Sequence, residues 1–459
     1  MVKSTSMQTL TILGGGLAGA EAAWQAARRG VPVRLFEMRP AHNTGAHLGG
    51  DLAELVCSNS LGSDLLDRAP GLLKAELSRL GSLLIDCARQ TATPAGRALA
   101  VDGEAFSARV TTLGGRHPLI QVVRAEVQAI PDGPLVIATG PLTSPALSKA
   151  IGALLGSPHL YFYDAIAPLV LAETIDWEIV YRASRYGVVG EPQGDYLNCP
   201  FDADQYARFV TALAQAERRP LQAFESAVER GVQAGEGIYF EACLPVEILA
   251  RRAPKTLAFG PMRPVGLIDP RSGRWPHAVV QLRQDNLAGS LYNLVGFQTN
   301  LTVSEQQRVF RMIPGLERAE FVRYGQMHRN TFINSPLHLQ PTLQMRKRAE
   351  IFFAGQISGV EGYVGNIATG LLAGWNAARL IQGLAPLVLP ETTMLGALCR
   401  YIYQADPGTF QPMKANYGLL PELAEAGCLG RRERARLQSQ RALCDLEEFL
   451  REPPIYQEK

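Results

Sequence analysis

Residues 9–19 read TLTILGGGLAG, and an acidic residue, Glu37, follows at the end of the segment VPVRLFE. A short apolar strand runs into the spacing Gly14-x-Gly16-x-x-Gly19, and a helix follows directly. Gly14 permits the tight turn, Gly16 lets the backbone approach a pyrophosphate, and Gly19 lets the helix pack on the strand. The N-terminus of that helix offers unpaired N–H groups and a partial positive charge to phosphates.

Glu37 ends a second apolar strand, where a carboxylate accepts hydrogen bonds from ribose hydroxyls. The order of strand, glycine turn, helix, strand and acid predicts a dinucleotide site. A glycine-rich turn in an ordinary strand–helix unit is the alternative. The residues expected to bind the dinucleotide here are Gly14, Gly15, Gly16, Leu17, Ala18, Gly19 and Glu37.

Two later segments favour FAD over NAD as the dinucleotide. Residues 135–140 read LVIATG, and residues 351–370 read IFFAGQISGVEGYVGNIATG, an apolar strand followed by glycines and a helix start. A late return of this kind brings a strand end and a helix N-terminus to the flavin and its phosphates. The residues expected to contribute are Gly355, Gln356, Gly362, Tyr363 and Asn366.

The composition is that of a large folded chain. Its 459 residues are 47% hydrophobic and 19% charged, which is enough for two or three domains. No apolar run reaches the length of a membrane span, and MVKSTSMQTL lacks the apolar core of a signal peptide, so we expect a cytoplasmic protein without a membrane partner. The formal net charge of +2 neither announces nor excludes nucleic-acid binding, because local patches decide it.

The pattern along the chain predicts an α/β fold. We expect a FAD-binding, doubly wound domain of the glutathione-reductase type, an inserted mixed α/β domain, and a helical, basic C-terminal tail. The predicted bounds are 1–160 and 324–459 for the two parts of the FAD domain and 161–323 for the insertion. Residues 69–90 show helical periodicity, whereas residues 233–266 and 278–296 have the texture of strands.

Seven cysteines without framework spacing indicate reduced thiols. Three lie where an apolar stretch meets a loop, and each is either a reactive thiol or an inert one: Cys57, Cys199 and Cys243. The other four lie in helical patterns and are expected to be structural: Cys87, Cys399, Cys428 and Cys444. Neither the cysteines nor the seven histidines show metal-ligand spacing, so no metal is expected.

Strings spread over nearly the whole chain resemble the folate- and FAD-dependent tRNA (uracil-5-)-methyltransferases. The matching strings are GGGLAGAEAAWQAARRGVPVRLFEMRP, AELVCSNSL, ALAVD, YFEACLPVE, GPMRPVGL, MHRNTFINSP, GQISGVEGYVGNIATG and FQPMKANYGLLP. A related wobble-uridine modification protein shares the N-terminal FAD fingerprint but has a much longer helical C-terminal domain. One local departure is PAGRALAVDG in place of PAGGALAVDR, which introduces Arg97 and Gly103.

The resemblance implies a reaction. Methylenetetrahydrofolate supplies one carbon, FAD reduced by NAD(P)H supplies electrons, and 5-methyluridine forms in the T loop of tRNA. A thiolate that adds to C6 of uracil makes C5 nucleophilic, and a base then removes the C5 proton. The remaining alternatives are a small-metabolite oxidoreductase, a non-catalytic flavin protein that binds RNA, and the same chemistry on another RNA.

The resemblance also implies which residues act. Cys57 and Cys243 are the two functional thiols, with Cys243 adding to uracil and Cys57 acting on the flavin side or as the base. Tyr363 is expected to cover the flavin, unless it is a packing residue. The folate side is expected at His328, Arg329 and Asn330.

Basic clusters occur at residues 251–252, at residues 346–348 and in the tail, where Arg431, Arg432, Arg434, Arg436 and Arg441 gather. Each alone is usually a solvated face. Together they permit a footprint on an RNA backbone, with binding that weakens as salt rises.

Overall fold

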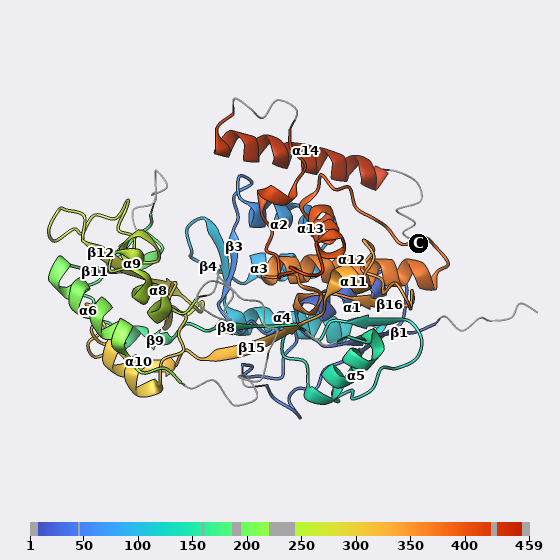
Figure 1. Cartoon of the computed structure of the whole chain (residues 1–459), viewed down its shortest axis with the longest axis horizontal. Coiled ribbons are helices and arrows are strands. Elements are labelled where there is room, and N and C mark those ends of the chain that lie inside the picture. The colour runs from blue at the N-terminus through green and yellow to red at the C-terminus, as the bar shows by residue number, and fades with distance from the viewer. Residues whose placement is uncertain are drawn as a thin grey trace, which may run out of the picture.

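A computed structural model of the chain describes residues 8–44, 46–157, 160–185, 194–219, 244–423 and 429–451. The right-hand body in Figure 1 carries the glycine motif on a five-stranded sheet. All its pairings are parallel. The strand order is β16 (Ile351–Phe353), β7 (Leu135–Ile137), β1 (Leu10–Leu13), β2 (Val33–Phe36) and β6 (Ile120–Val123). The late segment therefore returns to the first sheet, as the sequence predicts.

Helices cover both faces of this sheet, which makes it doubly wound. Alternate strand residues such as Ile12 and Phe352 pack into the cluster that includes α1 (Leu17–Ala27) and α12 (Tyr363–Ile381). Ile137 and Phe353 point to the other face, against α5 (Pro145–Leu155). The predicted fold class is confirmed, because a parallel sheet buried on both faces requires this arrangement.

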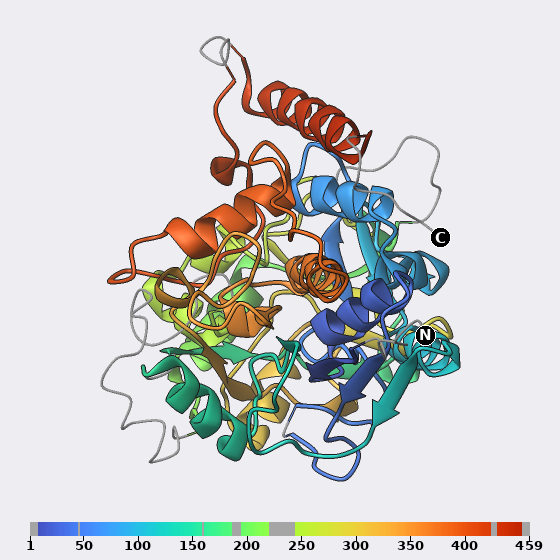
Figure 2. The same ribbon diagram turned by 90° about the vertical axis from the view of Figure 1, so that its right-hand side faces the viewer.

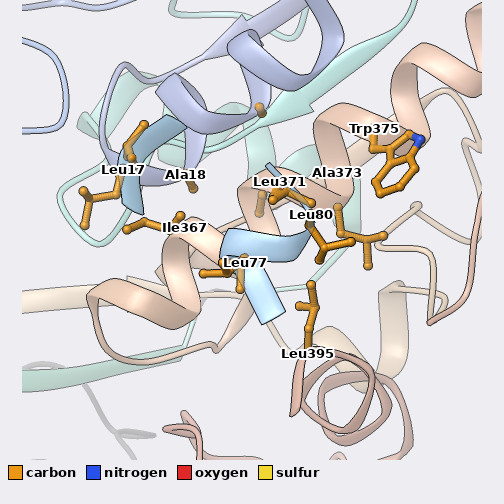
Figure 3. Close-up of a cluster of buried hydrophobic side chains, with 14 of the residues drawn as sticks. Leu17, Ala18, Leu77, Leu80, Ile367, Leu371, Ala373, Trp375 and Leu395 are labelled. Atoms are coloured by element: carbon orange, nitrogen blue, oxygen red, sulfur yellow. The ribbon is translucent and has the colours of Figure 1, made fainter. Parts of the chain in front are cut away.

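Small residues let α1 and α12 approach closely. A Cβ on Gly370 would lie 2.2 Å from the carbonyl oxygen of Ala18, and one on Gly374 would lie 2.3 Å from that of Ala22. Figure 3 shows the apolar cluster around this contact, where Leu17 and Ala18 of α1 lie near Ile367 and Leu371 of α12. The tight contact fixes the two helix N-termini relative to one another.

The left-hand lobe in Figure 1 is built on a six-stranded antiparallel sheet. Its order is β10 (Tyr181–Ala183), β11 (Tyr196–Phe201), β12 (Ala278–Gln284), β13 (Leu291–Leu294), β9 (Leu169–Leu171) and β14 (Phe321–Arg323). Its apolar core is separate from the core of the parallel sheet. The antiparallel pair β8 (Leu160–Ala165) and β15 (Met327–Phe332) runs between the two parts, and the exact domain bounds stay a prediction.

A three-stranded sheet of β3 (Ser60–Ser63), β5 (Ala98–Val101) and β4 (Ala92–Thr93) completes the strands of the described residues. The remaining helices there are α2 (Ala69–Arg79), α3 (Leu83–Gln90), α4 (Gly103–Arg116), α6 (Ala203–Gln215), α8 (Val246–Arg252), α9 (Thr256–Phe259), α10 (Val303–Phe310), α11 (Ser335–His338), α13 (Met394–Gln404) and α14 (Arg431–Arg451), with the 3-10 turns η1 (Ala172–Thr174), η3 (Gln356–Ser358) and η4 (Tyr417–Leu419).

The structure confirms one expectation of local structure and corrects another. The helical periodicity of residues 69–90 is confirmed by α2 and α3, which are divided where Gly81 has a φ of +72° and Ser82 caps the second helix. In the described part of residues 233–266, α8 and α9 replace the expected strands, since short apolar runs do not distinguish helix from strand. The strand texture of residues 278–296 is confirmed by β12 and β13.

The basic tail is helical, as predicted, and α14 lies across the top of the body in Figures 1 and 2. No helix among the described residues combines the length and apolar character needed to cross a membrane.

Candidate functional site

An open cavity with an empty volume of about 1020 Å³ lies at the carboxyl ends of β1, β7 and β16. Of the expected cofactor residues, those that line it are Gly14, Gly16, Leu17, Ala18, Glu37, Gly355, Gln356, Tyr363 and Asn366. Three others lie outside its lining. Gly15 lies behind Glu37, Gly19 packs against the carbonyl of Gly14, and Gly362 lines a second cavity.

The residues of this first cavity fit a dinucleotide. The N-caps of α1 and α12 are Gly16 and Gly362, and neither makes a side-chain capping hydrogen bond. A Cβ built on Gly16 would meet nothing within 4 Å, so the loop leaves open space there. The side-chain oxygen of Asn366 is buried without a hydrogen-bond partner. Two helix N-termini that receive no side-chain cap form a favourable place for phosphates, and the unpaired amide oxygen can accept a ligand donor.

Glu37 holds the glycine loop in place. Its carboxylate accepts from the Gly15 N–H at 2.9 Å and from the Arg39 Nε at 3.0 Å, and Arg39 also donates to Glu54 at 2.8 Å. Burial raises the pKa of Glu37, but its hydrogen bonds and the Arg39 charge outweigh burial and bring the pKa below its usual value. The residue keeps its charge and shapes the cavity wall. Arg39 is a contributor that the sequence patterns did not reveal.

A second cavity, with an empty volume of about 750 Å³, adjoins the first. The two share the lining residues Val56, Pro141, Leu142, Gln356, Tyr363 and Asn366. Segments far apart in sequence meet here, because Cys57, Asn330 and Lys414 all line the second cavity. Cys57 is partly exposed, as a reactive thiol requires.

Tyr363 lines both cavities. Its hydroxyl oxygen accepts hydrogen bonds from the backbone N–H of Cys57 at 2.8 Å and of Ser58 at 3.1 Å. Burial, with a further contribution from the charge of Cys57, raises the pKa of Tyr363 far above its usual value, so the hydroxyl stays neutral. The tyrosine therefore does more than pack, because it fixes the backbone that carries the thiol.

Two further contacts hold the segment after Cys57. The buried amine of Lys74, on α2, donates to the carbonyls of Leu61 and Gly62 at 3.0 Å and of Ser63 at 2.8 Å. Since these carbonyls belong to β3, the strand is anchored three residues beyond the site.

From the antiparallel sheet, Arg283 of β12 reaches toward the same segment. Its side chain is only 8% exposed, and its Nε donates to the Asn59 Oδ1 at 2.8 Å. Asn59 in turn donates to the carbonyl of Gln284 at 2.9 Å. Burial lowers the pKa of Arg283, while nearby groups that include Tyr363 and Cys57 raise it. An arginine remains protonated in such a place, and a cation close to a thiol favours the thiolate.

The other thiols are placed differently. Burial raises the pKa of Cys87 to about 11, that of Cys399 to about 12 and that of Cys199 still further, so these three are inert. Cys444 is exposed on α14, contrary to the buried structural role expected from its pattern, since the apolar stripe of that helix is narrow. Cys428 lies outside the described residues.

The remaining predicted site residues divide as follows. Cys243 lies outside the described residues. His328 and Arg329 lie on β15, opposite Asp164 and Tyr163 of β8. Asn330 is buried and lines the second cavity. Among the described residues, no group of three or more His, Cys, Asp or Glu side chains is placed to hold a metal ion. Arg283, Asn59 and Lys414 were not predicted, and only strings that matched a known family pointed to the last two.

Comparison with known proteins identifies the family of the chain. The sequence family described as Glucose inhibited division protein A matches residues 9–385. The methylenetetrahydrofolate--tRNA-(uracil-5-)-methyltransferase TrmFO of Heliobacterium modesticaldum is 57% identical over 451 residues, covering 98% of this chain and 100% of the relative. The protein of the same name from Moorella thermoacetica is 57% identical over 433 residues, covering 94% of this chain and 96% of the relative.

Among solved structures, GidA of Aquifex aeolicus in its form II crystal aligns with a TM-score of 0.66 at 18% identity. The alignment covers 98% of this chain and 75% of that one, and it shows a shared fold. With the family match and these relatives, the chain belongs to the Glucose inhibited division protein A family and, within it, to the methylenetetrahydrofolate--tRNA-(uracil-5-)-methyltransferases.

Proposed function

We propose that this chain methylates C5 of a uridine in the T loop of tRNA, with carbon from methylenetetrahydrofolate and with FAD reduced by NAD(P)H. The names of its relatives, each more than 50% identical over nearly the full length, support this enzyme and not a small-metabolite oxidoreductase. We place the reaction in the cytoplasm, where the substrates of such an enzyme occur. The structural observation that carries the proposal is a partly exposed thiol, Cys57, in the lining of the second cavity, which adjoins the first.

The first cavity would hold FAD. The glycine loop of Gly14 and Gly16 and the start of α12 at Asn366 would bind its phosphates, with Glu37 keeping the loop in shape. When bound and reduced, the flavin supplies the reducing equivalents that turn a transferred one-carbon unit into a methyl group. The apolar side chains in the lining help to exclude water from that step.

Cys57 lines the second cavity beside the first. Tyr363 fixes its backbone, and Arg283 holds Asn59, two residues further along the chain, while its charge interacts with Cys57. A thiolate in this place can accept the proton that leaves C5 of the uracil. This position beside the first cavity supports our assignment of Cys57 to the flavin side or to the base.

Cys243 is proposed as the nucleophile that adds to C6 of uracil. Its sulfur forms the bond to C6, the electron pair moves to C5, and C5 becomes able to attack the one-carbon unit. Once the C5 proton has left, the bond between the one-carbon unit and the folate nitrogen would break and release tetrahydrofolate, and the bond to sulfur would break as that unit is reduced to the methyl group. His328, Arg329 and Asn330 are proposed to face the folate, and the burial of Asn330 in the second cavity supports this for that residue.

One assay tests the proposed function. Purified holoenzyme is mixed with unmodified tRNA, NADPH and methylenetetrahydrofolate labelled in its methylene carbon, and the nucleosides of the digested RNA are identified. Label in 5-methyluridine is the expected result. NADPH consumption without labelled nucleoside would overturn the methyltransferase assignment. A covalent adduct of 5-fluorouracil-containing RNA with Cys57, with Cys243 dispensable, would reverse the roles of the two thiols.

A further inference from the structure

Two open cavities lie on either side of the start of α14, away from the flavin cavity. Their empty volumes are about 1950 and 1390 Å³. Both are lined by Asp67 and by Arg432, so they form one continuous feature around the helix, which we call the arginine groove. In Figures 1 and 2 this helix lies on the outer surface of the body, next to α2.

Arginines from three separate segments converge on the arginine groove. Those that line it are Arg68, Arg97, Arg431, Arg432, Arg434 and Arg436. All six are exposed. Arg97 is one of the two positions at which the chain departs from the family string, and Arg68 comes from the segment that leads into α2. Residues Arg432 and Arg436 are one helical turn apart and therefore project from the same face of α14.

The groove carries an excess of positive charge. Its acidic lining residues are Asp64, Asp67 and Glu422, half as many as the arginines. Asp67 is buried and pairs with Arg432 at 2.6 Å, and Asp64 pairs with Arg89, outside the groove, at 3.1 Å. Burial raises the pKa of Asp67, but the surrounding arginines outweigh it and lower the pKa. Arg432 anchors α14 to Asp67, which also lies 3.5 Å from Arg68, and the six arginines of the groove outnumber its three acidic residues.

The arginines at the start of α14 are placed where positive charge destabilises a helix. Arg431, Arg432 and Arg434 occupy the first turn of α14, where the helix dipole favours acidic side chains, and Glu433 is the acidic residue of that turn. An external anion on the arginine groove would relieve this repulsion. A polyanion fits best, because the arginines extend over two cavities rather than surround one point.

Two short stretches of chain connect the lining of the arginine groove with that of the second cavity. Lys414 lines that cavity and Ala415, the next residue, lines the groove. On the other wall, Ser60 lines the cavity and Asp64 lines the groove, a separation of at most about 14 Å along β3. A strand of RNA whose base enters the second cavity would therefore carry its neighbouring phosphates over the groove.

We propose that the arginine groove binds the phosphate backbone of the RNA whose uridine is modified. The inference rests on the proposed function and adds to it the surface that holds the substrate. Phosphate contacts set affinity and orientation without reading sequence. The groove therefore positions the RNA arm, whereas the two cavities select the base.

The test compares two double variants of the full holoenzyme. Arg431→Gln/Arg436→Gln removes two exposed charges from the groove and leaves the Arg432–Asp67 pair in place. Arg274→Gln/Arg318→Gln removes two exposed charges from the antiparallel lobe, neither of which lines the groove, and serves as the matched control. Dissociation constants for unmodified tRNA are measured from low to moderate salt, together with bound flavin and the thermal midpoint of each protein.

The groove variant should bind tRNA about tenfold more weakly at 0.1 M salt, with a salt slope shallower by about 1.5, since each lost phosphate contact removes close to one counterion. The control should bind as the wild type does. If the groove variant itself fails to fold, the single reversal Arg436→Glu on the exposed face gives the same comparison.

Equal affinity of the groove variant and the wild type, or equal losses in both double variants, would overturn the proposal. A failure of the proposed function looks different. In that case the wild type leaves no 5-methyluridine in the labelled assay, while the binding comparison still reports on the groove.

Discussion

The two adjoining cavities are built in different ways. The first takes its glycine loop, the start of α1 and Glu37 from the first βαβ unit, and residues that follow β7 and β16, such as Gly140 and Gly355, complete its lining. The second draws Cys57, Asn330 and Lys414 from distant segments and is supported from the other sheet by Arg283. Short sequence motifs therefore encode much of the cofactor site, whereas the surroundings of the reacting thiol form only when separate parts of the chain pack together. Four predictions test that difference, the largest expected effect first.

The strongest test separates two glycines of the motif. A Cβ on Gly19 would lie 1.8 Å from the carbonyl oxygen of Gly14, whereas one on Gly16 meets nothing within 4 Å. Gly19→Ala should lower the free energy of unfolding by about 4 kcal/mol or more, because backbone must move. Gly16→Ala should keep the thermal midpoint and weaken FAD binding alone.

Thermal unfolding and flavin absorbance of both variants check this. A yellow Gly19→Ala protein of normal stability would show that the close contact between helix and strand is not needed.

The second test concerns the carboxylate of the first cavity. Glu37→Gln leaves the buried Arg39 with a weaker partner, so the variant should be about 3 kcal/mol less stable at pH 7. The folded-state pKa of Glu37 is lowered, so its contribution is complete above the unfolded value of 4.5 and is lost as pH falls through the folded value. The gap in unfolding free energy should close in acid.

Denaturant titrations between pH 3 and 7 measure that gap. A gap that stays constant with pH would mean that lost packing, rather than charge, is responsible.

The third test compares two cysteines. Cys57→Ala should reduce methyl transfer at least about hundredfold with little change in thermal midpoint, because the side chain is partly exposed and acts in the chemistry. Cys199→Ala, in the buried strand β11, should lower the midpoint but preserve activity per folded molecule. Labelled-nucleoside yield and calorimetry give both quantities. Full activity in Cys57→Ala would remove this thiol from the mechanism.

The fourth test, with the smallest expected effect, asks whether Arg283 of the antiparallel sheet affects the reactivity of Cys57. Arg283→Gln should slow alkylation of Cys57 about tenfold at pH 7, since it removes a cation whose charge interacts with that thiol. Peptide mass spectrometry after timed alkylation follows that one thiol. Arg271→Gln is the control, because Arg271 pairs with Asp269 in the same lobe. Unchanged alkylation in Arg283→Gln would leave Arg283 a purely structural support.

Much of the first cavity was predictable because its chemistry depends on neighbours in sequence. The spacing of Gly14, Gly16 and Gly19 indicates where the chain turns and where a helix or a ligand approaches the backbone, and the apolar residues of β1 and β2 indicate buried strands. The role of Glu37 was only partly foreseen. The sequence placed a carboxylate at the end of the strand, but it did not show that the Arg39 side chain donates a hydrogen bond to that carboxylate.

The second cavity was less predictable for a physical reason. Asn59 and Arg283 are far apart in the chain, and no local pattern marks the hydrogen bond between them. The prediction of strand texture for the residues before Arg251 was wrong, because they form the helix α8. Packing rather than periodicity decides the structure of such a short apolar segment. Family resemblance singled out Cys57 and Cys243 and so left Cys199 as a structural thiol, and the burial of Cys199 gives the physical reason.

The sequence by itself determined the parallel α/β sheet, the dinucleotide loop and the late return to the first sheet, because glycine spacing and strand patterning act over short distances. Only the tertiary structure decided that Tyr363 fixes the backbone of Cys57, that Arg283 supports it from another sheet, and that the arginines of α14 join Arg68 and Arg97 in one groove. These contacts depend on how separate units dock, and docking is a property of whole surfaces rather than of any one segment.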